Sequence, residues 1–264
     1  MNHNLFDLSG KVALITGGNT GLGLGFARGI AKCGGDIMIW GRNEDRNRQA
    51  AEEIAALGVR VMTAQVEISD DEAVTSAMQS AVDQMGRLDC VIANAGLTLS
   101  GPSMLELGAD EFKSLIDINL NGAFYTIREG ARQMMKRVES GDPGGSIIAC
   151  GSLSVFCGVP SMAHYGASKA GMAALIKSAA IEFAPHGIRA NMVALGLART
   201  ELLRNRMGEE MAAMVEAAFA EQNPIPRAAT PEDVEGIAAY FASDASSYHT
   251  GDIVMLDGGR LAKI

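Results

Sequence analysis

The stretch Val12-Ala13-Leu14-Ile15-Thr16-Gly17-Gly18-Asn19-Thr20-Gly21-Leu22-Gly23 decides the fold class of this 264-residue chain. A short apolar, β-branched run, which is typical of a buried strand, leads directly into spaced glycines and then into a helical pattern. Glycines let the backbone approach a phosphate closely, and the following helix N-terminus offers free N–H groups and a positive dipole end. The stretch therefore predicts a phosphate-binding turn, although a glycine-rich turn can also be purely structural.

The rest of the chain repeats this strand-then-helix pattern. Apolar runs with almost no polar alternation lie at 12–16, 36–40, 59–66, 88–93, 146–150, 189–193 and 253–256. Such runs indicate strands that are buried on both faces, and amphipathic stretches such as 46–57 and 73–85 lie between them. The repetition predicts a Rossmann-type, doubly wound α/β fold, with a seven-stranded, mainly parallel sheet and helices on both faces.

The chain shows no linker, repeat or low-complexity segment, so we expect residues 1–264 to form a single domain. Only the segment 197–229 interrupts the strand–helix rhythm, after the sixth strand. It is helical in character, carries Arg199, Arg204 and Arg206, and ends in Asn223-Pro224-Ile225-Pro226. Because an insertion at this point lies over the carboxyl ends of the strands, where ligands bind, we predict a small helical substrate lid.

The composition narrows the functional classes. A net charge of -9 argues against a nucleic-acid partner, because the phosphate backbone requires a basic face. No apolar run approaches the ~18 residues of a membrane span, and the N-terminus lacks the features of a signal peptide. The cysteines lack C-x-x-C spacing, so we expect free thiols, no metal site and a cytoplasmic location.

Tyr165 and Lys169 are four residues apart, about one helical turn, so their side chains should share a face. A neighbouring ammonium favours phenolate, so the sequence predicts a Tyr165 pKa below its usual value of about 10. A tyrosine of this kind suits general acid–base catalysis. Y-x-x-x-K is common on helices, however, and this pair alone does not establish catalysis. The neighbouring His164 must point away from Tyr165, so we expect it to be hydrogen-bonded or exposed.

Gly41 and Arg42 follow the second apolar run, where an acidic residue would bind the ribose 2′-hydroxyl of NAD. A guanidinium instead matches a 2′-phosphate, which favours NADP(H). NAD(H) stays open as the alternative, because Arg42 could also be a solvated loop residue.

Together these motifs resemble the short-chain dehydrogenase/reductase family in its shorter, single-domain form. The resemblance covers essentially the whole chain, from Leu8-Ser9-Gly10-Lys11 to Asp257-Gly258-Gly259. Its motifs occur in order: the glycine turn, Asn94-Ala95-Gly96, Asn119 within Asp117-Ile118-Asn119-Leu120, Ser152, the Tyr165/Lys169 pair, and Leu195-Gly196 followed by Thr200.

The resemblance implies reversible hydride transfer between a nicotinamide and a carbonyl or alcohol carbon. It makes Tyr165 the general acid or base, with Lys169 lowering its pKa. Ser152 would hold the substrate oxygen and Asn119 a proton-relaying water. The implied cofactor contacts are Gly17, Asn19, Thr20, Gly21, Leu22, Gly23, Arg42, Glu67, Asn94, Gly96, Tyr165, Lys169, Gly196 and Thr200. Glu67 and Leu195 depart from the family's usual aspartate and proline.

The substrate class stays open. One interpretation is a ketone or 3-oxoacyl thioester reductase that acts on a small carbonyl or alcohol substrate. A second is a sugar-acid dehydrogenase of the gluconate type, which Gly41-Arg42-Asn43 also resembles. A hypothesis of another class is a dinucleotide-sensing binding protein without catalysis. The resemblance further implies a homotetramer, or a homodimer, with no membrane partner.

Overall fold

A computed structural model describes residues 4–97 and 101–262, and the side chains of Leu202 and Arg206 lie outside the described part. Its seven-stranded sheet has the order β3-β2-β1-β4-β5-β6-β7, and every neighbouring pair is parallel. The strands are β1 (Val12–Thr16), β2 (Asp36–Gly41), β3 (Val61–Gln65), β4 (Cys90–Ala93), β5 (Gly145–Ser152), β6 (Ile188–Leu195) and β7 (Ile253–Leu256). The predicted Rossmann-type fold is confirmed, with a sheet that is parallel throughout.

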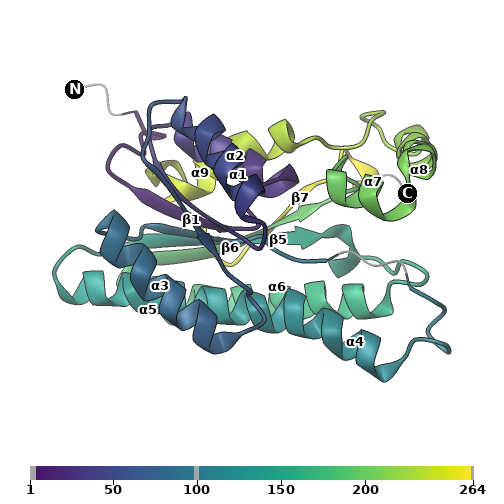
Figure 1. Cartoon of the computed structure of the whole chain (residues 1–264), viewed down its shortest axis with the longest axis horizontal. Coiled ribbons are helices and arrows are strands. Elements are labelled where there is room, and N and C mark those ends of the chain that lie inside the picture. Colours follow the sequence, from purple (N-terminus) through teal and green to yellow (C-terminus); the bar gives the residue numbers. More distant parts are fainter. Residues whose placement is uncertain (1–3, 98–100, 263–264) are drawn as a thin grey trace.

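Helices cover both faces of the sheet, as Figure 1 shows. One face carries α1 (Gly21–Ala31), α2 (Glu44–Ala55) and α9 (Glu235–Ala242). The other carries α3 (Asp71–Met85), α4 (Ala109–Ile116), α5 (Gly122–Glu139) and α6 (Ala163–Phe183). Within the described ranges, no helix is long and apolar enough to cross a membrane.

The alternation of side chains along β1 explains why the sheet needs both helical layers. Val12 and Leu14 belong to the core under α3, α5 and α6, whereas Ala13 and Ile15 belong to the core under α1, α2 and α9. All four residues are at most 2% exposed. A strand buried on both faces reads as an uninterrupted apolar run, which is why the sequence pattern identified it.

The carboxyl ends of the strands meet at one edge of the sheet. Ser152, the last residue of β5, is paired with Leu195 of β6, and Leu195 is paired with Leu256 of β7. Chain order reverses on either side of β1, because β2 and β4 are its two neighbours. Ligands bind at such a reversal in open α/β sheets. The helices α7 (Glu201–Met207) and α8 (Glu209–Glu221) lie at this end of the molecule (Figure 1).

Helix α1 packs unusually closely against its surroundings. A Cβ atom on Gly23 would lie 2.0 Å from the carbonyl oxygen of Gly17, and one on Gly29 would lie 2.3 Å from that of Glu235. Backbone cannot yield as a flexible side chain can, so these glycines fix the distance of α1 from the turn and from α9.

We expect Gly29→Ala to destabilise the protein by about 1–3 kcal/mol, because the added methyl overlaps the backbone of α9. Gly236→Ala is the matched control, since Gly236 lies in α9 with no atom near its Cβ position. Alanine should raise stability there by up to about 1 kcal/mol through its helix propensity. Urea denaturation measures the change in unfolding free energy for both variants. Equal effects of the two substitutions would contradict the close packing.

Candidate active site

The helix α6 carries the Tyr165/Lys169 pair to the end of β5. Lys169 is 4% exposed, and its Nζ atom donates a hydrogen bond of 2.8 Å to the carbonyl oxygen of Cys150 in β5. Tyr165 lies one turn earlier, with its ring centroid 5.8 Å from that Nζ atom. Ser152 follows Cys150 by two residues and hydrogen-bonds the Tyr165 side chain. The structure therefore brings three of the four predicted catalytic residues together.

The predicted lowering of the Tyr165 pKa is wrong for this cofactor-free arrangement. Burial raises the pKa of Tyr165 to about 12, and the hydrogen bond with Ser152 opposes this only in part. Burial also lowers the pKa of Lys169. Both shifts have the same physical cause, because removing water penalises the charged form of either group. The Lys169 ammonium points to Cys150 rather than to the phenol oxygen, so it does not offset the desolvation of Tyr165.

Asn119, the fourth predicted catalytic residue, lies in a π-helical turn (Asp117–Asn121) between α4 and α5. Its Oδ1 accepts from the Leu97 N–H at 2.7 Å, and its Nδ2 donates to the Leu97 carbonyl at 2.8 Å. Nδ2 also lies 3.3 Å from Ser168 Oγ, which ties this turn to α6. The sequence analysis did not single out Ser168, although its position next to Lys169 was a visible signal. π-helical turns occur often at functional sites.

Gly96 lies between Asn119 and Lys169. A Cβ atom at Gly96 would be 3.0 Å from Asn119 Oδ1 and 3.7 Å from Lys169 Nζ. The two polar groups therefore flank the same backbone position, next to the end of β4. This places Asn119 close to Lys169 on α6.

The glycine turn fits a pyrophosphate. Gly17 and Gly21 adopt φ values of 63° and 54°, which suit glycine. The N-cap residue Thr20 makes no capping hydrogen bond through its side chain, and the first turn of α1 holds no acidic residue. The first N–H groups of a helix have no partner within it, so those of α1 are available to an anion.

A network of hydrogen bonds at the end of β1 holds the glycine turn in place. Thr16 Oγ1 accepts from the N–H groups of Asn94 and Ala95 at 3.0 Å each, and Asn94 Nδ2 donates to the Thr16 carbonyl at 2.9 Å. Asn94 thus supports the turn from beneath. Asn19 donates to Asn47 Oδ1 at 2.7 Å, so its side chain points to α2. The sequence analysis placed Thr16 at the start of the glycine turn but gave it no role, and it did not single out Asn47, since neither side chain stands out from a strand or a helix.

The predicted 2′-phosphate residue Arg42 pairs with Glu67, another predicted cofactor contact. Arg42 Nη1 lies 3.5 Å from Glu67 Oε2, and both side chains are largely exposed. A second arginine nearby, Arg46, lies 3.5 Å from Glu201 at the start of α7. Thr200 caps α7, and its Cγ2 would lie 3.4 Å from a Cβ atom on Gly21. The segment after β6 therefore begins beside the glycine turn.

Gly196 lies at the end of β6, in contact with the segment that carries α8. Its N–H donates to the Leu256 carbonyl at 3.1 Å. A Cβ atom here would lie 3.2 Å from both Asp257 Cα and Phe219 Cζ. A side chain at position 196 would have to displace Asp257 or the Phe219 ring by a few tenths of an ångström, so glycine fits this position best.

His164 differs from the expectation. It is fully buried, and neither ring nitrogen has a hydrogen-bond partner among the described residues. Its ring lies near Gly101, whose Cβ position is 3.5 Å from His164 Cε1. The helix does turn it away from Tyr165, but the loop before α4 covers it.

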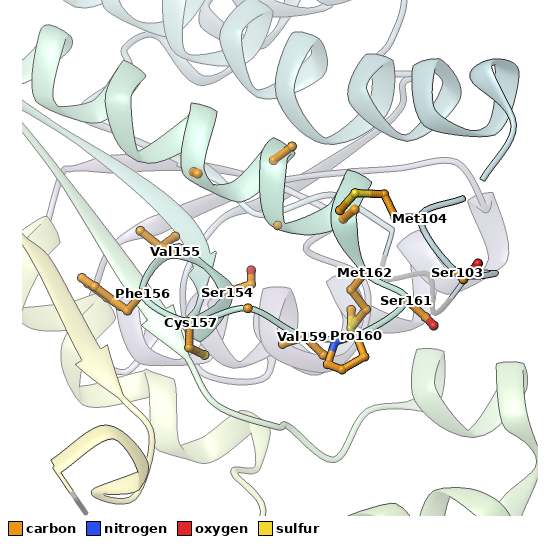
Figure 2. A pocket seen from close by; sticks show the side chains of 15 residues that line it. Ser103, Met104, Ser154, Val155, Phe156, Cys157, Val159, Pro160, Ser161 and Met162 are labelled. Atoms are coloured by element: carbon orange, nitrogen blue, oxygen red, sulfur yellow. The ribbon is translucent and has the colours of Figure 1, made fainter. Parts of the chain in front are cut away.

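A cavity of about 780 Å³ lies between α6 and the segment that follows β5. Figure 2 shows Ser154, Cys157 and Val159 along that segment, with Met104 on the far side. Its lining is mostly apolar. The cavity adjoins α6 through Ala163, Gly166 and Ala167, but neither Tyr165 nor Ser152 lines it.

Comparison with known proteins agrees with this geometry. The family model described as enoyl-(acyl carrier protein) reductase matches residues 17–260. A 3-oxoacyl-[acyl-carrier-protein] reductase from Chlamydia pneumoniae is 34% identical, over 96% of this chain and 97% of its own. An L-rhamnose 1-dehydrogenase (NAD(P)(+)) from Sphingomonas sp. (strain SKA58) is 32% identical, over 97% of this chain and 98% of its own.

A solved structure is equally similar. Carveol dehydrogenase from Mycobacterium avium, in complex with NAD, superimposes with a TM-score of 0.86 at 30% identity. The match covers 97% of this chain and 99% of that one. These similarities cover almost the full length of the chain. They agree with the all-parallel sheet and with the order of the sequence motifs. The chain belongs to the short-chain dehydrogenase/reductase family of NAD(P)-dependent oxidoreductases.

Proposed function

We propose that this protein is an NADP(H)-preferring oxidoreductase that interconverts a ketone and a secondary alcohol, with Tyr165 as its general acid or base. The observation that carries the proposal is the buried cluster of Tyr165, Lys169 and Ser152 at the carboxyl end of β5. Catalytic groups with displaced pKa values cluster at functional sites, and both Tyr165 and Lys169 have displaced values.

In reduction, the Ser152 hydroxyl donates to the substrate carbonyl oxygen and stabilises the charge that develops there. The phenol of Tyr165 then gives its proton to the same oxygen. A bound nicotinamide supplies or accepts the hydride. Lys169 hydrogen-bonds the Cys150 carbonyl and would have to turn towards the phenol to favour its ionised form, and Asn119 would position a water that restores the proton. In oxidation, Tyr165 acts as the base.

The glycine turn would hold the pyrophosphate, and Gly196 and Thr200 the nicotinamide end. Asn94 and Gly96 would lie along the adenosine half. We favour NADP(H) because Arg42 stands at the end of β2 and a guanidinium binds a phosphate bidentately. Glu67 pairs with Arg42 in the absence of cofactor, so a 2′-phosphate would have to exchange places with that carboxylate.

Two substrate classes fit the relatives. The C. pneumoniae relative is named for a 3-oxoacyl thioester substrate and the Sphingomonas relative for a sugar. The apolar cavity beside α6 supports a ketone with apolar bulk, whereas a sugar acid of the gluconate type is the alternative. In either case we propose that the segment 197–229 covers the substrate. A dinucleotide-sensing protein without catalysis is the alternative of another class.

We further propose a homotetramer, or a homodimer, in the cytoplasm. Beyond the residues that line the cavity, α6 exposes Ala174, Ser178 and Ile181, and these small and apolar side chains suit contact with another helix. The four cysteines are unpaired, which supports a reducing compartment. Sedimentation at micromolar concentration tests the assembly, and a monomeric mass would refute it.

Tyr165→Phe should lower kcat for ketone reduction by about 10²–10⁴-fold, because it removes the proton donor and little else. Cofactor binding, measured by fluorescence titration, should persist. Tyr248→Phe is the matched control, since Tyr248 is fully exposed on the surface. Turnover of a ketone panel that survives Tyr165→Phe unchanged would favour the non-catalytic sensing alternative.

Arg42→Ala should raise the KM for NADPH by about tenfold, in line with the loss of one charge-assisted hydrogen-bonded contact, and leave that for NADH nearly unchanged. Glu67→Gln should lower the KM for NADPH, because it removes the carboxylate that pairs with the Arg42 guanidinium. Arg48→Ala serves as control: Arg48 lies further along α2 and pairs with Asp45. Steady-state kinetics with both cofactors measure the outcome. An unchanged NADPH KM in Arg42→Ala would refute the 2′-phosphate assignment.

The pKa of Tyr165 gives a third test, on cofactor-free protein. The folded pKa, about 12, lies above the unfolded value of about 10, so between these values the native state holds a proton that the unfolded chain releases. Its contribution to stability is therefore complete below pH 10 and declines as the pH rises towards 12. Tyr165→Phe should show a shallower loss of unfolding free energy in urea between pH 10 and 12, and identical slopes would contradict the assignment.

A further inference from the structure

Asn47, a buried residue of α2, ties the end of β2 to the glycine turn. Its side chain is 2% exposed, and its Nδ2 donates to the carbonyl oxygens of Gly41 at 3.0 Å and Ala64 at 3.2 Å. These two carbonyls lie at the ends of the neighbouring strands β2 and β3. The Oδ1 of Asn47 accepts from Asn19 Nδ2 at 2.7 Å. One side chain therefore connects three segments at the place where we expect the adenosine end of the cofactor.

The two backbone carbonyls determine how both amides are oriented. A carbonyl oxygen only accepts, so Asn47 has to turn its Nδ2 towards the strands and its Oδ1 towards the glycine turn. Because this Oδ1 is an acceptor as well, Asn19 has to present its Nδ2. Within the described ranges, the second N–H of that atom has no acceptor, and Asn19 is half-buried. The network thus fixes a hydrogen-bond donor, rather than an acceptor, at the end of β2.

The same bridge explains why position 41 is occupied by glycine. A Cβ atom on Gly41 would lie 2.2 Å from Asn19 Nδ2 and 2.4 Å from Asn47 Oδ1. Either atom could move away only by breaking the hydrogen bond between the two side chains. A side chain at position 41 and the Asn19–Asn47 bridge therefore exclude each other. The end of β2 is also where an acidic residue would bind the ribose 2′-hydroxyl of NAD.

The backbone that carries Arg42 is held by a further contact. Gln65 Nε2 donates to the Arg42 carbonyl oxygen at 2.9 Å, and Gln65 is paired with Gly41 in the register of β2 and β3. The Arg42 side chain is 65% exposed, and 3.5 Å separate it from Glu67. The strand end is thus fixed while the guanidinium can move. An anion at this point would find one mobile donor on Arg42 and one fixed donor on Asn19.

We infer that Asn47 is a positioning residue that sets the cofactor preference of this protein, because it holds the Asn19 amide across the end of β2. The inference rests on the proposed function, since it takes the end of β2 as the place of the cofactor's 2′ group. A phosphate offers only acceptors at neutral pH apart from its last proton, so it suits the donors of Asn19 and Arg42. The bridge also occupies the space that a carboxylate at position 41 would need in order to select NAD(H).

The test compares the Kd values of NADPH and NADH, from titrations of the fluorescence of Trp40, the one tryptophan of the chain. Asn47→Ala should raise the Kd of NADPH about tenfold and that of NADH less than about threefold, because the Asn19 donor loses its orientation. Asn191→Ala is the matched control. Asn191 is also buried, and it bridges His249 and Asp252 by hydrogen bonds away from the proposed cofactor site. Its substitution should lower stability and leave both Kd values unchanged.

A second variant removes the bridge from its other end. Asn19→Ala leaves the two strand contacts of Asn47 in place, so it tests the bridge even if Asn47→Ala fails to fold. Asn19→Ala should weaken NADPH binding at least as much as Asn47→Ala does. The double variant should bind NADPH no more weakly than Asn19→Ala alone, since Asn47 acts through Asn19. Additive losses would overturn the positioning role.

The exclusion between the bridge and a side chain at position 41 has its own test in urea denaturation. Gly41→Ala should lower the urea midpoint in the wild type, because the added methyl overlaps both amides. The lowering should be much smaller in the Asn47→Ala background, where Asn19 is free to move aside. Equal lowering in the two backgrounds would overturn the exclusion.

Because the Kd values are measured without turnover, the inference and the proposed function can fail separately. If the protein reduces ketones but Asn47→Ala weakens NADPH and NADH equally, Asn47 has only a structural role, and the inference is overturned while the proposed function stands. If Asn47→Ala weakens NADPH alone while no ketone is reduced, the inference is supported and the oxidoreductase function is not. A wild type that binds NADH as tightly as NADPH overturns the inference, and the proposed preference for NADP(H) with it.

Discussion

The parallel register of the sheet is the constraint on which the site depends. Because every strand runs the same way, the carboxyl ends of β1, β4, β5 and β6 meet at one edge. Ser152, Gly196 and the glycine turn are distant in sequence and become neighbours only there. The hydrogen bonds of Thr16 and Asn94 across the ends of β1 and β4 then fix the turn against that edge. A shift in register would separate the proposed proton donor from the phosphate site.

Burial decides the chemistry of the Tyr165/Lys169 pair. Lys169 donates a hydrogen bond to the Cys150 carbonyl, and this bond connects α6 to β5. The same burial keeps Tyr165 protonated and favours the neutral form of Lys169. In the proposed mechanism a protonated Tyr165 is the form that reduction needs, whereas oxidation needs the phenolate, which additional positive charge would have to stabilise.

The arginines around the site differ in their ion-pair partners and in how deeply those partners are buried. Arg42 and Arg46, at and after the end of β2, pair with Glu67 and Glu201 through exposed contacts that solvent weakens. Arg199 pairs with buried Glu216 as part of the packing of α8. A surface pair can exchange its carboxylate for a ligand at small cost, while a buried pair cannot, so Arg42 is better suited than Arg199 to bind an anion.

The sequence by itself determined the strand–helix alternation, the glycine turn and the identity of the Tyr165, Lys169, Ser152 and Asn119 cluster. These follow from local periodicity and from motif spacing, which can be read from the sequence without knowledge of the fold. It could not determine the direction of the Tyr165 pKa shift, the burial of His164, or the support from Thr16, Asn47 and Ser168. Each of these depends on which groups surround a side chain and how much water they exclude. That is settled only when segments remote in sequence pack together, so the tertiary structure decided it.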